Sequence, residues 1–281
     1  MHTPQGKKGD EDDMATTICV GDLHLKQTRV LPRLDGAIRQ FEAQRVVLLG
    51  DACDDWGLSD DDALSELLCF KAWVQTRREQ GLQVDVLVGN HEMPYLMDMI
   101  GPGTHVPIRG LIKQVLSDLD LKCAAVVGDR LCTHAGVTRT WQAAYAQNAQ
   151  TADELCAMLN GYFADPDTWE RLITIGPGRG GGDVPGPLWA DQHELLRFPM
   201  PGVNQIVGHT PVYGILREDV TGGAEAWFCD TFSVTPYGWP QGEASVLVVE
   251  DDGAGEPVYT IDKLFDSDEW LSLMRTRMLS A

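Results

Sequence analysis

The sequence predicts an α/β fold in which several buried strands each end in a glycine followed by a side chain that can bind a metal ion. Three segments have this form. Largely apolar runs at 16–20, 45–49 and 84–88 lead into Gly21-Asp22-Leu23-His24, Gly50-Asp51 and Gly89-Asn90-His91. Short runs of this composition are typical of strands that are buried on both faces. Ligands in open α/β sheets bind at the carboxyl ends of the strands, so we expect these polar side chains to share one crevice.

Amphipathic helices are expected between these strands. Apolar residues recur at helical spacing over 30–44, which predicts a β-α-β start. A second helix is expected over 60–80. Ser59 is positioned to cap it, three aspartates occupy its first turn, and Gly81 follows its end.

The remainder of the chain predicts a mixture of short strands and helices within a single domain over 15–281. A β-hairpin is expected around Gly128-Asp129. The other expected strands are 205–207, 226–230, 245–250 and 258–261, and the other expected helices start at Pro107 or cover 139–147, 151–163, 166–175 and 267–278. Residues 176–187 form a glycine-rich loop. Residues 1–14 are charged, contain no apolar signal-peptide segment and predict a disordered leader.

The composition excludes several classes of protein. The chain has 22 basic and 42 acidic residues, a formal charge of −20, which argues against binding to nucleic acid or to an anionic membrane surface. No apolar run approaches the ~18 residues of a membrane-spanning helix. The seven cysteines include no Cys-x-x-Cys pair, so buried reduced thiols and a cytoplasmic location are expected rather than disulfides or a zinc ribbon.

Six side chains at the expected strand ends form a candidate metal centre. They are Asp22, His24, Asp51, Asn90, His134 and His209. Two carboxylates, three imidazoles and one amide oxygen suit Mn, Fe, Zn or Ni. Six ligands are too many for one tetrahedral ion and suit two ions that share a carboxylate. Such pairs, held ~3.5–4 Å apart, can clamp a phosphoryl group during displacement.

The order of these motifs resembles that of the calcineurin-like metallophosphoesterases. The motifs are Gly21–His24, Gly50–Asp54, Gly89–Glu92, His134–Gly136 and Gly208–Thr210. The sequence is most similar to the phosphoprotein-phosphatase branch, which includes bacterial and phage Ser/Thr phosphatases and symmetrical diadenosine tetraphosphate hydrolases. The resemblance implies a β-sandwich flanked by helices, in a four-layer αββα arrangement.

The resemblance also implies a role for each site residue. Asp22, His24 and Asp51 would bind the first metal, while Asn90, His134 and His209 would bind the second, with Asp51 bridging. His91 would be the general acid, oriented by Asp54. The cofactors would be two divalent transition-metal ions, with manganese the first expectation and Fe, Zn or Ni the alternatives. Bound metal lowers the pKa of water from ~15.7 towards ~7, so a bridging hydroxide could attack the phosphorus directly.

The sequence departs from the phosphatase branch where an Arg-Gly pair usually grips the phosphate. Asp55-Trp56-Gly57 stands there instead, which replaces a positive charge with a negative one. Another arginine is then expected to bind the phosphate, with Arg179 the first candidate and Arg139 the second. Trp56 and Trp189 are expected either in a stacking wall for a nucleobase or in the core.

The function expected from the sequence is hydrolysis of phosphomonoesters, with a Ser/Thr phosphoprotein as the leading substrate. The alternative is a diadenosine-polyphosphate or nucleotide hydrolase, which the run 134–138, nearby Trp141 and the missing arginine favour. A third hypothesis is a non-catalytic regulatory protein that binds metal.

Overall fold

Two β-sheets pack face to face in the computed structural model of the chain, which describes residues 15–253 and 255–280. The first sheet has the order β11 (Val258–Lys263), β10 (Ser245–Asp251), β1 (Ala15–Val20), β2 (Arg45–Leu48), β3 (Gln83–Leu87) and β4 (Leu121–Lys122). The second has the order β5 (Ala124–Val127), β6 (Arg130–Thr133), β7 (Asn204–Val207), β9 (Ala224–Phe228) and β8 (Leu216–Val220). The leader expected over residues 1–14 lies outside the described residues.

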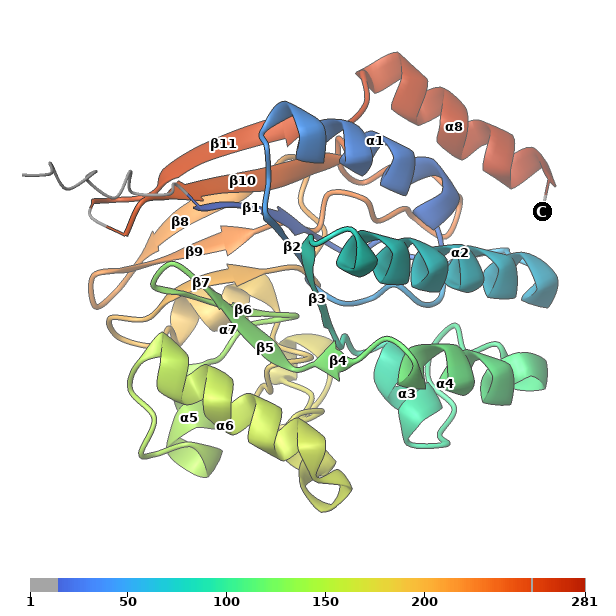
Figure 1. Cartoon of the computed structure of the whole chain (residues 1–281). Coiled ribbons are helices and arrows are strands. Elements are labelled where there is room, and N and C mark those ends of the chain that lie inside the picture. Colours follow the sequence, from blue (N-terminus) through green and yellow to red (C-terminus); the bar gives the residue numbers. More distant parts are fainter. Residues whose placement is uncertain (1–14, 254, 281) are drawn as a thin grey trace, which may run out of the picture.

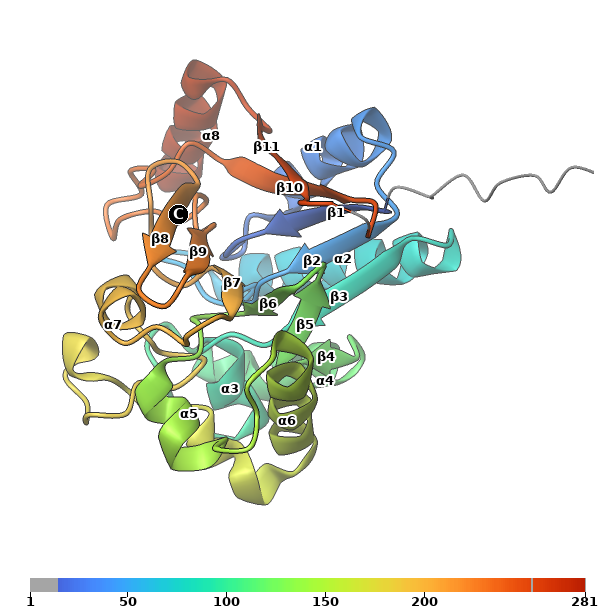
Figure 2. The same ribbon diagram turned by 90° about the vertical axis from the view of Figure 1, so that its left-hand side faces the viewer.

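Helices cover the outer face of each sheet (Figures 1 and 2). The first sheet is covered by α1 (Gln27–Gln40), α2 (Asp60–Glu79), α4 (Arg109–Ser117) and α8 (Ser267–Ser280). The second is covered by α5 (Arg139–Tyr145), α6 (Ala152–Ala164) and α7 (Gln192–Arg197). The expected sandwich flanked by helices is therefore confirmed.

The central strands are apolar on both faces because each face packs in a different core. Ile18 of β1 and Val46 of β2 pack beneath the helices, whereas their neighbours Cys19 and Val47 face the second sheet. All four side chains are fully buried. This double burial explains why the strands appear in the sequence as continuous apolar runs.

Most of the expected elements form, with short or polar elements as the exceptions. The Ser59 hydroxyl caps α2 by accepting the backbone N–H of Asp62, at 3.2 Å. The hairpin around Gly128 also forms. The helix expected over 166–175 is instead a 3₁₀ helix, η2 (Pro166–Arg171). The short helices α3 (Glu92–Leu96) and α7 and the strand β8 were not predicted, because they are too short or too polar to show a clear apolar period.

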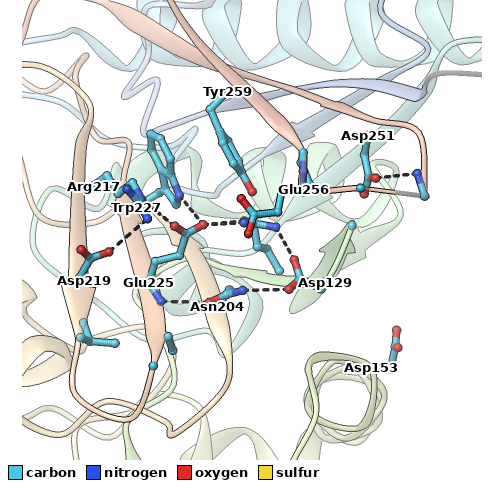
Figure 3. A pocket seen from close by; sticks show the side chains of 18 residues that line it. Asp129, Asp153, Asn204, Arg217, Asp219, Glu225, Trp227, Asp251, Glu256 and Tyr259 are labelled. Carbon is cyan, nitrogen blue, oxygen red and sulfur yellow. Dashed lines mark hydrogen bonds and ion pairs between the residues drawn. The ribbon is translucent and has the colours of Figure 1, made fainter.

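A paired polar network occupies the end of the sandwich where β6 and β7 begin, beside an open cavity of about 1020 Å³ (Figure 3). The Arg130 guanidinium donates to Glu225 Oε1 at 2.9 and 2.6 Å and lies 4.6 Å from the centre of the Tyr259 ring. Tyr259 stacks on Trp227, whose indole N–H also donates to Glu225. Because Arg130 and Glu225 form an ion pair and the contacts of the network join three strands, we interpret it as structural.

The state of the cysteines and the character of the helices agree with what the composition predicts. All seven cysteines lie in the described residues and are free thiols, and the four expected to be buried, Cys19, Cys123, Cys132 and Cys229, are buried. Within the described part of the chain, no helix combines the length and apolarity needed to cross a membrane.

Candidate metal centre

The loops after β1, β2 and β3 lie together because the three strands are parallel neighbours. The backbone at these strand ends is tightly packed. Gly50 has a φ of +99°, and a Cβ there would lie 2.8 Å from the backbone nitrogen of Gly89. A Cβ on Gly89 would lie 2.1 Å from Asp51 Oδ1. The glycines that precede the candidate ligands therefore allow the loops to approach one another.

In the first group of candidate ligands, His24 faces one oxygen of Asp51, whereas Asp22 is held by the backbone of His209. His24 Nε2 lies 3.9 Å from Asp51 Oδ2. The other ring nitrogen of His24 lies 2.9 Å from the carbonyl oxygen of Asp54, which orients Nε2 towards Asp51. Asp22 is fully buried and accepts the backbone N–H of His209 at 2.9 and 3.0 Å.

The second group lies on the other side of the same carboxylate. His134 Nε2 lies 3.3 Å from Asp51 Oδ2, 2.8 Å from Asn90 Oδ1 and 3.1 Å from His209 Nδ1. His134 Nδ1 lies 2.9 Å from the carbonyl oxygen of Leu49, so Nε2 is the nitrogen presented to the cluster. Among the described residues, the His, Cys, Asp and Glu ligand atoms gather in two groups that share Asp51. His24 and His91 belong to one group and His134 and His209 to the other, whereas Asp22 belongs to neither.

The charges of this buried cluster fit bound cations. Burial, and then the charges of Asp230 and Asp51, raise the pKa of Asp22 well above its usual value. Burial, and then His134, lower the pKa of His209, which keeps that imidazole neutral. Among the described residues, His209 Nε2 is buried and has no hydrogen-bond partner. The nitrogen that His209 presents to the cluster is Nδ1, 3.1 Å from His134 Nε2. Crowded carboxylates beside imidazole nitrogens are the donor set expected for divalent ions.

Asp230 is a further buried carboxylate of the site that the sequence did not indicate. It follows β9 and is 1% exposed, and burial is the largest cause of its raised pKa. One of its oxygens accepts the Ser233 hydroxyl at 2.9 Å. No glycine precedes Asp230, so it lacks the pattern that marks the other strand ends.

Glu92 holds two of the loops in position. Its carboxylate, which is buried, accepts three backbone N–H groups at 2.7–2.9 Å, from Gly89, Asp51 and Cys53. Each of these bonds is assisted by the charge of the carboxylate. Glu92 thus joins the loop after β2 to the loop after β3.

His91, which is partly exposed, and the buried Asp54 form a pair at the edge of the metal cluster. His91 Nδ1 lies 3.1 Å from Asp54 Oδ2, and the Tyr95 hydroxyl donates to the other oxygen of Asp54. Burial lowers the pKa of His91, but the charge of Asp51 and the hydrogen bond that His91 donates to Asp54 outweigh burial and raise the pKa to about 9. Tyr95 is a positioning residue that the sequence did not indicate, because only the fold brings its hydroxyl to Asp54.

A cleft of about 300 Å³ opens over these residues. It is lined by His24, Asp51, Asp54, Asn90, His91 and His209 of the site. Pro102 and Gly103 line it from the segment between α3 and α4, and Arg179 lines it from the glycine-rich loop over 176–187. Arg179 Nη2 lies 3.4 Å from Asp191 and 3.5 Å from the Thr210 hydroxyl. Arg139 is exposed at the start of α5 and is not among the residues that line the cleft.

The negative charge that the sequence indicates at Asp55 is compensated. Asp55 Oδ2 lies 2.9 Å from Lys26 Nζ, and the side chains of Asp55 and Lys26 are 4% and 0% exposed. The Lys26 ammonium therefore offsets the negative charge that Asp55 brings to the cleft. The structure instead shows an ion pair beneath the wall of the cleft.

The three tryptophans considered from the sequence occupy different environments. Trp56 is 57% exposed and lines the cleft, so it does not belong to the core. Trp189 also lines the cleft, 5.8 Å from the ring of His209 in an edge-to-face arrangement. Trp141 is fully buried, and its indole N–H donates to the Arg171 carbonyl. Trp141 is therefore unavailable to a base, which removes one observation that favoured a dinucleotide substrate.

Solved structures share this fold. The crystal structure of a cold-active protein-tyrosine phosphatase from a psychrophilic Shewanella species is 19% identical, with a TM-score of 0.50, and the match covers 94% of this chain and 87% of that one. A point mutant of a cold-active protein tyrosine phosphatase is 17% identical, with a TM-score of 0.53 and coverage of 93% and 86%. No protein-family model matches the sequence, and no curated protein matches it.

These similarities establish the fold. The chain shares the fold of these two structures, and its two sheets flanked by helices form the αββα arrangement that the order of its motifs implies. The candidate metal centre lies at the strand ends, where that resemblance placed it.

Proposed function

We propose that the protein is a phosphomonoesterase that depends on two divalent metal ions. The observation that carries the proposal is the position of Asp51, whose Oδ2 lies 3.9 Å from His24 Nε2 and 3.3 Å from His134 Nε2. One carboxylate thus contacts both groups of ligands, as a bridging ligand must. Asp22, His24 and Asp51 would hold one ion, and Asn90, His134, His209 and Asp51 the other.

When bound, the ions would supply a hydroxide nucleophile at neutral pH and a cationic surface for phosphoryl oxygens. The residues of the chain would do the rest. Arg179, on the rim of the cleft, would bind a phosphoryl oxygen through its guanidinium. His91, held by Asp54, would donate a proton to the leaving oxygen from Nε2.

The proposed substrate is a phosphorylated protein side chain, with phosphoserine and phosphothreonine as the class expected from the sequence and manganese as the first metal to test. Diadenosine polyphosphates are the second candidate. The absence of the usual arginine beside Asp54 still favours them, whereas the burial of Trp141 does not.

Metal-dependent turnover of p-nitrophenyl phosphate tests the proposal. Manganese-supplied protein should release nitrophenol, and chelation should abolish the release. Protein that binds two ions but hydrolyses no ester would instead support the regulatory hypothesis. Parallel assays with a phosphopeptide and with diadenosine tetraphosphate then separate the two enzyme hypotheses.

A further inference from the structure

We propose that Trp56 is a specificity-determining wall of the cleft that favours aryl phosphates, in which a planar ring is bonded directly to the ester oxygen. This inference rests on the proposed phosphomonoesterase activity. It replaces the serine or threonine ester expected from the sequence with an aryl ester as the preferred substrate. It is carried by the exposure of Trp56, by the way its loop is anchored, and by the second tryptophan of the cleft.

Most of the Trp56 side chain is exposed, so its packing contributes little to the fold. It is 57% exposed, follows directly after Asp54 and Asp55, and lines the same cleft as the candidate metal ligands. A large aromatic side chain is usually buried when its role is structural. An exposed indole beside a reaction centre is therefore available to pack against a substrate.

The backbone of Trp56 is held in position by a buried ion pair. The Trp56 N–H donates to Asp55 Oδ1 at 2.7 Å, and Asp55 Oδ2 lies 2.9 Å from Lys26 Nζ. Lys26 Nζ also donates to the carbonyl oxygen of His24, at 3.1 Å. The same lysine thus ties the Trp56 loop to a candidate metal ligand. This connection holds the indole near the site although little of the side chain is packed.

The remaining lining of the cleft suits a flat apolar group. Trp189 provides a second aromatic surface and contacts His209 edge to face. Further apolar lining comes from Pro102, Pro211 and Val234. The volume of about 300 Å³ lies at the lower end of the range for small-molecule sites, which suits one ring with its phosphate better than a dinucleotide.

The chemistry of an aryl ester places its ring in this part of the cleft. With the phosphorus at the metal ligands and the ester oxygen facing His91, the next atoms of the substrate lie towards the walls. Hydroxide, formed from a water molecule that has lost one proton to solvent, bonds to phosphorus as the bond between phosphorus and the aryl oxygen breaks. The electron pair of that bond leaves on the phenolic oxygen, which takes the proton from His91. A serine or threonine ester would place a flexible aliphatic chain beside Trp56 instead of a ring.

Binding of two phosphonates that cannot be hydrolysed tests the inference without a contribution from leaving-group reactivity. Manganese-supplied protein should bind phenylphosphonate about 5-fold more tightly than cyclohexylphosphonate, measured by calorimetry, because an aromatic pair adds a modest preference over apolar contact alone. The preference should be lost in Trp56→Ala and retained in Trp56→Phe. Trp239→Ala is the matched control, because Trp239 is 47% exposed but is not among the residues that line the cleft.

Turnover of aryl esters separates failure of the inference from failure of the proposed function. If the metal-supplied protein hydrolyses no phosphomonoester, both proposals are overturned. If it hydrolyses them but shows no phenyl preference, or if Trp56→Ala keeps that preference, only the aromatic wall is overturned. Comparison of a phosphotyrosyl peptide with phenyl phosphate then identifies the source of the ring, and faster turnover of either one is consistent with the inference.

Discussion

His91 Nδ1 lies 3.1 Å from Asp54 Oδ2, and this contact joins the loop after β3 to the loop after β2. Asp54 is 2% exposed, and its other oxygen accepts the Tyr95 hydroxyl. The carboxylate is therefore held from two sides. His91 can present only Nε2 to a substrate while it keeps this bond, so its ring has a fixed orientation at the mouth of the cleft.

Replacement of His91 by alanine should lower kcat far more for an alkyl phosphate than for an aryl phosphate. General acid catalysis typically contributes about 10²–10⁴-fold. An alkyl ester releases an alkoxide. Because an alcohol is about as weak an acid as water, whose pKa is ~15.7, the alkoxide needs a proton in order to leave. A phenolate, with a conjugate-acid pKa of ~10, depends on it less. Steady-state kinetics on both esters, with metal content measured in parallel, would check the result. Equal losses for both esters would contradict the role of His91 as proton donor.

Replacement of Arg179 by alanine should lower kcat/KM for a phosphomonoester about 10-fold or more, because a hydrogen bond to a charged group contributes about 1.5–3 kcal/mol. Arg179 lines the cleft, whereas Arg139 does not. Arg139→Ala is therefore the discriminating comparison and should leave kcat/KM unchanged. If kcat/KM falls in the Arg139 variant but not in the Arg179 variant, Arg139 and not Arg179 binds the phosphate. Metal content should be the same in both variants.

The central part of the site could be predicted because its signal is local. Asp22, Asp51 and Asn90 each follow a glycine at the end of an apolar run, and parallel strands bring such ends to one edge. Neither the run nor the glycine depends on distant contacts. The same pattern identified His209 after β7.

The parts that could not be predicted depend on pairings between distant segments. Lys26 and Asp55 carry no shared sequence signal, yet their ion pair changes the charge of the cleft. Asp230 lies near the site because β9 is parallel to β7, a neighbour relationship that the sequence did not reveal. Trp141 illustrates the opposite case, since it lies close to His134 in sequence but its side chain is fully buried in a separate core.

Replacement of Asp51 by asparagine should reduce the bound metal from two ions to one or none per chain. The carboxylate contacts both groups of ligands, and an amide offers neither its charge nor a second oxygen. Elemental analysis by mass spectrometry after manganese loading would count the ions. Asp129→Asn is a suitable control, because the Asp129 side chain is 66% exposed at the opposite end of the sandwich. If the Asp51 variant still binds two ions per chain, the proposal that Asp51 bridges them is contradicted.

Replacement of Asp85 by asparagine should destabilise the protein at neutral pH, and the effect should disappear in acid. The Asp85 side chain is 2% exposed and lies 2.6 Å from both Arg45 Nη2 and Lys122 Nζ. Burial raises its pKa, but the bonds from Lys122 and Arg45 outweigh burial and lower the pKa below its usual value. The associated stability is therefore present above the unfolded pKa of ~3.9 and is lost as the pH falls through the lower folded value.

The expected loss at pH 7 is about 2–3 kcal/mol in the free energy of unfolding. This loss is smaller than the ~3–5 kcal/mol expected when a fully buried ion pair is broken, because Lys122 is 42% exposed and can be solvated. Urea unfolding of the wild type and the variant at pH 7 and near pH 3 would measure the difference. Asp118→Asn provides the control, because its ion pair with Lys71 is largely exposed and should contribute at most about 1 kcal/mol. A difference for Asp85→Asn that stays constant down to pH 3 would show that the lost stability does not depend on the charge of Asp85.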